Sequence, residues 1–217
     1  MTTVLLIRHG RTAANATGIL AGRSPGVLLD AQGRRQARTL RTRLRDLPID
    51  VLVSSPLERC IETADGILGT RPEVERMTDD GLTECDYGQW TGRPLAELAE
   101  EPLWPTIQRS PSEVTFPGGE SMLAMAERAT AAVSTWVARH PEGTVVVVSH
   151  GDVIKAILSD ALGQPLDQFQ RIVIGPGSIS VVQYRDDRST VVRMNDTGNR
   201  LPIQPASARP TVGGGAG

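Results

Sequence analysis

Two short apolar runs constrain the fold of this 217-residue chain more than any other feature. Val4–Ile7 and Val145–Val148 are apolar at every position, without the alternation of a half-exposed strand. Such runs are typical of strands that are buried on both faces, and these occur mainly in parallel sheets covered by helices on either side. The two runs therefore predict a parallel sheet inside an α/β protein.

Amphipathic segments follow the apolar runs. Residues 30–46 open with Asp30, a suitable N-cap, and place Ala37, Leu40 and Leu44 at helical spacing. This pattern predicts a helix that packs one apolar face against the sheet.

Further along the chain, strand and helix signals continue to alternate. A short strand at 51–53 precedes Ser54-Ser55-Pro56, which predicts a helix start, and that helix should run to about Leu68. The remaining patterns predict a strand near Val74, a helix at 120–139 capped by the Gly118-Gly119 turn, a helix from Asp152 through Leu162, and a hairpin of residues 179–184 and 190–194. We expect a three-layer α/β/α sandwich with a mostly parallel central sheet.

The domain organisation follows from length and local composition. We expect one catalytic domain over residues 1–203, since a chain of this length usually forms one core. Residues 78–119 are rich in Gly, Pro and acidic residues, and we call them the lid segment because long excursions of this kind are often functional. Residues 204–217 contain mostly Pro, Ala, Ser and Gly and predict a disordered tail.

The charge balance limits the class of partner. The chain carries 23 basic and 25 acidic side chains, a formal net charge of −2, so we expect no nucleic-acid partner. Of the basic residues, 22 are arginine and only Lys155 is lysine. Codon bias explains most of that excess, and each arginine has to be judged by its neighbours.

The location is predicted from what interrupts the apolar runs. These runs are short, four residues in Val4–Ile7 and in Val145–Val148, far fewer than the ~20 that span a bilayer, and Arg8 and His9 end the first run at once. Cys60 and Cys85 cannot form a disulfide framework and show no metal-ligand spacing. We expect a cytoplasmic protein without a membrane partner, a metal or another cofactor.

Basic side chains follow three predicted strands directly. Arg8 and His9 end the first strand, Arg59 lies one helical turn after the second, and His150 follows the later apolar run. Ligands of an open α/β sheet bind at the carboxyl ends of its strands, so these side chains should converge. A cationic pocket at helix N-termini favours a dianion such as phosphate.

Five segments occur in this order: Leu6-Ile7-Arg8-His9-Gly10-Arg11-Thr12 with Asn15; Ser54-Ser55-Pro56-Leu57-Glu58-Arg59; Leu82-Thr83-Glu84 with Tyr87-Gly88-Gln89-Trp90-Thr91-Gly92; Phe116-Pro117-Gly118-Gly119-Glu120-Ser121; and Val148-Ser149-His150-Gly151. Together they resemble the motifs of the histidine phosphatase superfamily, in its phosphoglycerate-mutase-like branch. The resemblance covers residues 3–195.

The resemblance implies a role for each matched side chain. His9 would be the nucleophile and form a phosphohistidine, while Arg8, Arg59 and His150 would hold the phosphoryl oxygens. Asn15 would add a neutral contact to the phosphate. Glu84 would protonate the leaving group and then activate water.

Several assignments stay open. Asp152 is a rival acid, although an Asp that opens a helix ordinarily caps it. The segment 22–29 departs from the family pattern at Pro25 and Leu29, so Gly22 and Arg23 are candidate substrate contacts, with a surface position as the alternative for Arg23. Gly151 is a further candidate contact.

Three functions remain in view. A phosphatase acting on a small phosphorylated metabolite is the leading hypothesis, because the family's mutases carry Arg-His-Tyr-Gly after the acid and a long basic insertion. This chain has Cys85-Asp86-Tyr87-Gly88, and its insertion holds only Arg93 and Arg109 among four glutamates. A bisphosphoglycerate-dependent mutase is the alternative, and a non-catalytic phospho-ligand-binding module the third. A homodimer is left open.

Overall fold

A single six-stranded sheet organises the computed structural model, which describes residues 1–69, 71–186 and 188–198. The strand order is β3-β2-β4-β1-β5-β6. The first four strands of that order are parallel, and β5 and β6 are antiparallel to their neighbours. The strands are β1 (Thr2–Arg8), β2 (Val51–Ser54), β3 (Glu75–Thr78), β4 (Thr144–Ser149), β5 (Ile179–Arg185) and β6 (Arg188–Asp196). The predicted mostly parallel sheet and its closing hairpin are confirmed.

The two apolar runs are the central strands β1 and β4. They pair in parallel with Val4 opposite Val145 and Ile7 opposite Val148, and the side chains at those four positions are fully buried. Alternate residues of β1 pack into two different cores, one on each face of the sheet. Both faces are covered, which is the physical reason that these runs lack polar alternation.

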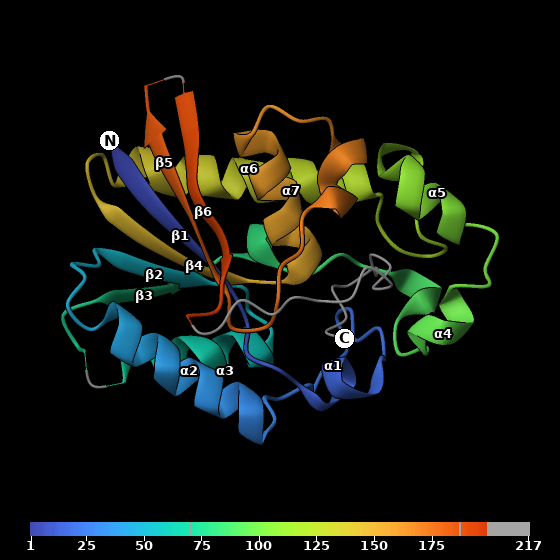
Figure 1. Ribbon diagram of the computed structural model, residues 1–217, viewed down its shortest axis with the longest axis horizontal. Helices are drawn as coiled ribbons and strands as arrows, with labels where there is room; N and C mark the ends of the chain where they lie inside the picture. Colours follow the sequence, from blue (N-terminus) through green and yellow to red (C-terminus); the bar gives the residue numbers. More distant parts are fainter. Residues whose placement is uncertain (70, 187, 199–217) are drawn as a thin grey trace.

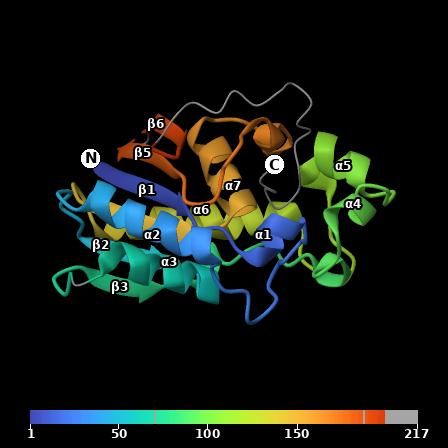
Figure 2. The same ribbon diagram turned by 60° about the horizontal axis from the view of Figure 1, so that its bottom comes forward.

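Helices form the outer layers of the sandwich, as Figures 1 and 2 show. On one face lie α2 (Ala31–Leu44) and α3 (Glu58–Leu68), and on the other α6 (Met122–Arg139) and α7 (Gly151–Ala161). The apolar stripe of α6, including Met122, Met125 and Trp136, is buried in the core. The predicted three-layer architecture is confirmed.

Two predicted helix starts are wrong, and side-chain capping explains both. The helix after β2 begins at Glu58 rather than at Pro56, because the Ser55 hydroxyl accepts a hydrogen bond from the backbone N–H of Leu57 and closes a turn first. Helix α6 is capped by Ser121, whose hydroxyl accepts a hydrogen bond from the N–H of Ala124, and not by the Gly118-Gly119 turn before it. Asp30 caps α2 as predicted, accepting from the N–H of Gly33.

The lid segment, residues 78–119, is more ordered than its composition indicates. It holds the short helices α4 (Leu95–Leu98) and α5 (Trp104–Arg109) and the 3-10 turns η1 (Asp80–Leu82), η2 (Gly88–Trp90) and η3 (Pro111–Glu113). Leu98, Ile107 and Phe116 are buried in one core with the sheet. Figure 1 shows α4 and α5 at the side of the molecule where α1 (Ala13–Thr17) also lies.

The rest of the described chain adds the 3-10 turn η4 (Leu166–Arg171) between α7 and β5. Within the described residues, every helix is too short or too polar to cross a membrane. The predicted tail, 204–217, lies outside the described residues.

Candidate active site

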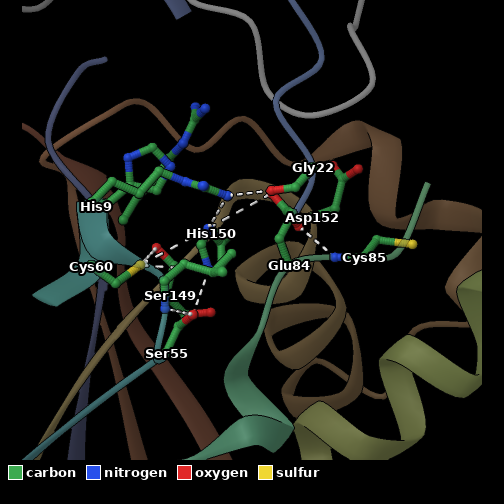
Figure 3. Close-up of polar contacts among 12 residues, drawn as sticks. His9, Gly22, Ser55, Cys60, Glu84, Cys85, Ser149, His150 and Asp152 are labelled. Atoms are coloured by element: carbon green, nitrogen blue, oxygen red, sulfur yellow. Dashed lines mark hydrogen bonds and ion pairs between the residues drawn. The ribbon is translucent and has the colours of Figure 1, made fainter. Parts of the chain in front are cut away.

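The predicted cationic side chains meet at the carboxyl ends of the parallel strands. Arg8 ends β1 and His9 follows it, His150 follows β4, and Arg59 lies in the first turn of α3 after β2. All four side chains are buried, and the ring centroids of His9 and His150 are 5.3 Å apart (Figure 3). The strand-end rule therefore placed these residues correctly.

A recess of about 400 Å³, counted with its open mouth, lies above His9. The side chains around it are of two kinds. Some are polar or charged and the others are apolar or glycine; the lining residues are Arg8, His9, Thr12, Ala14, Asn15, Gly18, Ile19, Leu20, Ala21, Gly22, Arg59, Glu84, Tyr87 and Leu95.

One nitrogen of His9 is fixed by the backbone. Its Nδ1 lies 2.8 Å from the carbonyl oxygen of Gly10, which can only accept, so Nδ1 carries the proton. Burial, and then the charges of Arg59 and Arg8, hold the pKa of His9 well below 6.5. The imidazole is therefore neutral at physiological pH, and its Nε2 is the nitrogen left for a ligand.

The two buried guanidinium groups supply fixed positive charge. Arg8 donates from Nη1 to the carbonyl of Ile174 at 2.6 Å; burial lowers its pKa, and the charges of Glu84 and Asp152 oppose that shift. Arg59 donates from Nη2 to the carbonyl of Gly22 at 2.8 Å. Its Nη1 is buried and has no hydrogen-bond partner among the described residues. An unsatisfied buried donor costs about 1–3 kcal/mol, so an anion in the recess would gain that contact.

His150 is held from both sides. Its Nε2 lies 2.8 Å from the Ser55 hydroxyl, and its Nδ1 lies 3.1 Å from Nη2 of Arg59, from which it accepts. Burial, and then the Arg59 charge, keep its pKa well below 6.5. The Cys60 thiol is 3.5 Å from Nε2, and burial raises its pKa to about 12. His150 does not line the recess, so it reaches a ligand through Arg59 unless its ring gives up one of these bonds.

Glu84 is the carboxyl group that lines the recess. It is 4% exposed, and its Oε1 accepts from the backbone N–H of Cys85. Burial first, and then the charge of Asp152, raise its pKa to about 7, against the opposing charges of Arg59 and Arg8. Such a carboxyl group can hold or release a proton near neutral pH, which suits an acid that later acts as a base.

Asp152, the rival acid, lies deeper and does not line the recess. It is fully buried and accepts a hydrogen bond of 2.8 Å from the hydroxyl of Tyr87. Its expected capping role is wrong, because His150 occupies the N-cap position of α7 and places Asp152 inside the first turn. This placement favours Glu84 as the acid.

The loop that carries Glu84 is held by its main chain. Nε of Arg23 and Nη2 of Arg128 both donate to the Glu84 carbonyl, at 2.9 and 3.1 Å. The carboxylate of Glu120 pairs with both arginines and accepts from the N–H of Asp86. Arg23 is exposed, as the surface alternative predicts, and its bonds also hold the loop that carries Glu84. Its contact with substrate stays a prediction.

The other candidate contacts are placed as follows. Gly22 lines the recess with φ of +50°, and a Cβ there would meet the Thr91 hydroxyl at 2.8 Å, so only glycine fits. Asn15 lines it as well, but its Oδ1 accepts from the N–H and the hydroxyl of Thr12 in a capping box, which leaves its amino group for a ligand. Gly151 begins α7 and does not line the recess.

The segment 22–29, whose role the sequence left open, is tied to α3. Glu58 accepts from the N–H of Gly26, and Glu62 accepts from the N–H of Leu29, whose side chain is buried. Glu58 stands inside one of the five motifs, whereas Glu62 belongs to none of them. The segment therefore forms one supported wall beside the site.

Sequence reasoning missed the residues that act behind the site: Tyr87, Glu120, Arg128 and Lys155. Tyr87 and Glu120 stood inside recognised motifs and could have been singled out for that reason. Arg128 and Lys155 lie in helices α6 and α7, where a single sequence gives no sign of their partners. Among the described residues, no three His, Cys, Asp or Glu side chains are arranged to hold a metal ion.

Comparison with known proteins gives one consistent family. The model of the histidine phosphatase superfamily, branch 1, matches residues 4–197. Phosphoserine phosphatase 1 of Hydrogenobacter thermophilus is 31% identical over 204 residues, 91% of this chain and 93% of the relative. A probable phosphoglycerate mutase of Proteus mirabilis is 33% identical over 189 residues, 86% of each chain. The solved mycobacterial glucosyl-3-phosphoglycerate phosphatase in complex with VO3 has a TM-score of 0.81 at 27% identity, covering 89% of this chain and 98% of that one.

Proposed function

The chain belongs to branch 1 of the histidine phosphatase superfamily, and we propose that it hydrolyses small phosphomonoesters through a phosphohistidine on His9. The single observation that carries this proposal is the neutral His9 in a recess with two buried arginines, one of them with an unsatisfied donor. A neutral imidazole nitrogen is a nucleophile, and fixed guanidinium donors stabilise the charge on a transferring phosphoryl group.

In the first step, Nε2 of His9 attacks phosphorus and the P–O bond to the leaving group breaks. The proton on Nδ1 stays in its hydrogen bond with the Gly10 carbonyl, which supports the positive charge that the ring acquires. Arg8 and Arg59 hold the phosphoryl oxygens. Glu84 gives its proton to the leaving alkoxide, so the alcohol departs neutral.

In the second step, the ionised Glu84 takes a proton from water as the water oxygen attacks phosphorus. The P–N bond breaks, inorganic phosphate forms and His9 returns to its neutral state. Glu84 has then regained its proton, so the cycle closes without another reactant. The resemblance implies that His150 holds a phosphoryl oxygen; we assign it instead the positioning of Arg59, because both of its ring nitrogens are engaged. We keep Asn15 as a neutral phosphate contact.

The lid segment favours hydrolysis over mutase chemistry. A mutase has to bind a substrate with a second anionic group, and a buried charge without a partner is unfavourable by several kcal/mol. Arg93 of the lid segment and Arg23 of segment 22–29 do not line the recess and are engaged in ion pairs, Arg93 with Glu101 at 2.7 Å and Arg23 with Glu120 at 2.9 Å. The walls of the recess present Ile19, Leu20 and Leu95 instead. We therefore propose substrates whose leaving group carries no second negative charge.

A phosphate-release screen tests the function. Phosphates of uncharged alcohols, such as glycerol, sugars and nucleosides, should give kcat/KM values at least tenfold above those of 3-phosphoglycerate and phosphoserine. Isomerisation of 3-phosphoglycerate that depends on 2,3-bisphosphoglycerate would instead establish a mutase. Phosphate binding without any turnover would establish a binding module.

A gain-of-charge variant tests the substrate class separately. Leu95→Arg places a cation at the mouth and should raise the relative kcat/KM for 3-phosphoglycerate by roughly tenfold. Leu123→Arg, at an exposed position of α6, adds the same charge away from the recess and should change nothing. Equal responses of the two variants would contradict the proposal.

Three further expectations accompany the enzyme. We propose cytoplasmic location and metal-independent chemistry, for which full activity after treatment with EDTA is the test. We propose no nucleic-acid or membrane partner. The homodimer stays a prediction that sedimentation measures directly.

A further inference from the structure

The single lysine of the chain is buried. Lys155 is 3% exposed and lies one turn after Asp152 on α7, whereas 22 other basic positions hold arginine. A lysine is almost never fully buried unless its ammonium group is paired. The position of Lys155 therefore points to a specific requirement.

The contacts of Lys155 show that requirement. Its Nζ donates to Oε1 of Gln170 at 3.0 Å, lies 3.4 Å from Oδ1 of Asp152 and sits 5.1 Å from the centre of the Phe169 ring. An ammonium group with three donors and an aromatic neighbour can be satisfied in this space. A guanidinium would bring five donors and a larger plane to the same place.

The partner of Lys155 is the fully buried carboxylate of Asp152, which does not line the recess. Oδ2 of Asp152 accepts from the Tyr87 hydroxyl, and Oδ1 faces the ammonium group. Burial and the Asp152 charge raise the pKa of Tyr87 well above 10, so the phenol remains a donor. Two donors on one fully buried carboxyl group form the environment of an ionised carboxylate.

We propose that Asp152, held by Lys155 and Tyr87, is a positioning residue whose negative charge keeps the proton on the general acid Glu84. Two neighbouring buried carboxylates repel each other, and Asp152 has the Tyr87 hydroxyl and the Lys155 ammonium group to hold its charge in place. Figure 3 draws both carboxyl groups in the site, and only Glu84 lines the recess. The inference rests on the proposed function, because it needs Glu84 to be the acid.

Among the charged groups that act on Glu84, Asp152 favours the protonated form of the Glu84 carboxyl group. Arg59 on α3 and Arg8 on β1 favour the ionised form, and the ring of His150, 4.0 Å away, is neutral. Burial acts in the same direction as Asp152, and together they raise the pKa of Glu84 to about 7. Loss of the Asp152 charge should therefore leave Glu84 ionised more of the time at neutral pH.

The decisive measurement is the pH profile of kcat/KM for two substrates in Asp152→Asn. With an alkyl phosphate, which needs the acid, the basic limb should move down by about one pH unit. With p-nitrophenyl phosphate, whose leaving group needs little protonation, the profile should barely move. A disturbance of Arg8 or of phosphate binding would reduce kcat/KM equally for both substrates. A difference between the two substrates therefore reports on proton donation by Glu84.

Matched variants complete the test. Asp160→Asn removes the same charge from an exposed position of α7 and should leave both profiles unchanged. Asp152→Glu keeps the charge and should restore the alkyl-phosphate profile at least in part. Lys155→Met removes the support of the carboxylate and should shift the basic limb in the same direction as Asp152→Asn, so the inference stays testable if one variant folds poorly.

An unchanged basic limb for alkyl phosphates in folded Asp152→Asn and Lys155→Met would overturn the inference and leave a structural role only. The proposed function fails by a different result. If Glu84→Gln hydrolyses alkyl phosphates like the wild type, Glu84 is not the acid, whatever Asp152 does.

Discussion

The two histidines follow the central strands at equivalent positions, yet their surroundings differ. His9 has one nitrogen bonded to a backbone carbonyl and lines the recess with the other free for a ligand. His150 has both nitrogens engaged, with Ser55 and with Arg59, and lies below the recess. The comparison teaches that topology brings a side chain to the site, whereas its hydrogen bonds decide whether it reacts or supports.

The strongest way to break this comparison is His9→Ala. We expect a loss of turnover on the order of 10³-fold or more, since the nucleophile of a covalent mechanism is removed. The measurement is hydrolysis of p-nitrophenyl phosphate together with trapping of acid-labile, base-stable phosphoprotein. Residual turnover near the wild-type rate, or phosphoprotein that persists in the variant, would refute His9 as the nucleophile.

A smaller effect is expected for His150→Ala. Arg59 loses one of the bonds that orient it, so affinity for phosphate should fall by roughly 10- to 100-fold while phosphoprotein still forms on His9. Competitive inhibition by phosphate and single-turnover labelling measure the two effects. Complete loss of labelling would show that His150 reacts directly, and the distinction between the histidines would disappear.

Ser55→Ala sharpens the comparison further. It removes the hydroxyl that holds Nε2 of His150 and that also accepts from the N–H of Leu57, and it leaves the contact between His150 and Arg59. We expect a few-fold decrease in kcat/KM and about 1–3 kcal/mol less stability to unfolding, since two hydrogen bonds are lost and each usually contributes about 0.5–1.5 kcal/mol. Steady-state kinetics and urea denaturation supply both numbers, and Ser24→Ala, in the loop away from this bond, is the control.

The smallest expected effect is on the acidic side of the pH profile. The pKa values of both histidines lie well below 6.5, so with an aryl phosphate kcat/KM should stay flat from pH 7 to below pH 6. The unfolded chain binds protons on these histidines near pH 6.5 and the folded chain does not, so stability should decrease as pH falls below that value. Denaturation midpoints at several pH values test this, and a stability that rises on acidification would contradict neutral buried histidines.

The fold and the cationic floor could be predicted because each depends on local signals. The sequence predicts buried strands at Val4–Ile7 and Val145–Val148. Arg8 and His9 follow the first strand directly, and His150 lies two residues after the second. The position of Arg59 could be predicted because it lies about one helical turn after a predicted strand. These residues are placed by strand ends, so no distant partner had to be known.

The remaining features depend on contacts between distant segments. Arg128 holds the carbonyl of Glu84 across 44 positions of sequence, and Lys155 meets Gln170 from another element. The predicted capping role of Asp152 was wrong because the N-cap of α7 is His150, two residues before Asp152 in the sequence. Helix α5 has only six residues, too few for a clear helical pattern in the sequence. It is held by the buried side chain of Ile107 and by stacking of the Trp104 ring on Trp90.

The backbone that carries Ile19 and Leu95, two residues that line the recess, has a consequence for evolution and engineering. Segments 18–20 and 92–95 are joined by main-chain hydrogen bonds: the N–H of Leu20 to the carbonyl of Arg93, the N–H of Gly92 to the carbonyl of Leu20, and the N–H of Leu95 to the carbonyl of Gly18. Main-chain bonds persist when side chains change. Ile19 and Leu95 can therefore be randomised on a constant frame, so new leaving-group preferences can be selected there without rebuilding the catalytic floor.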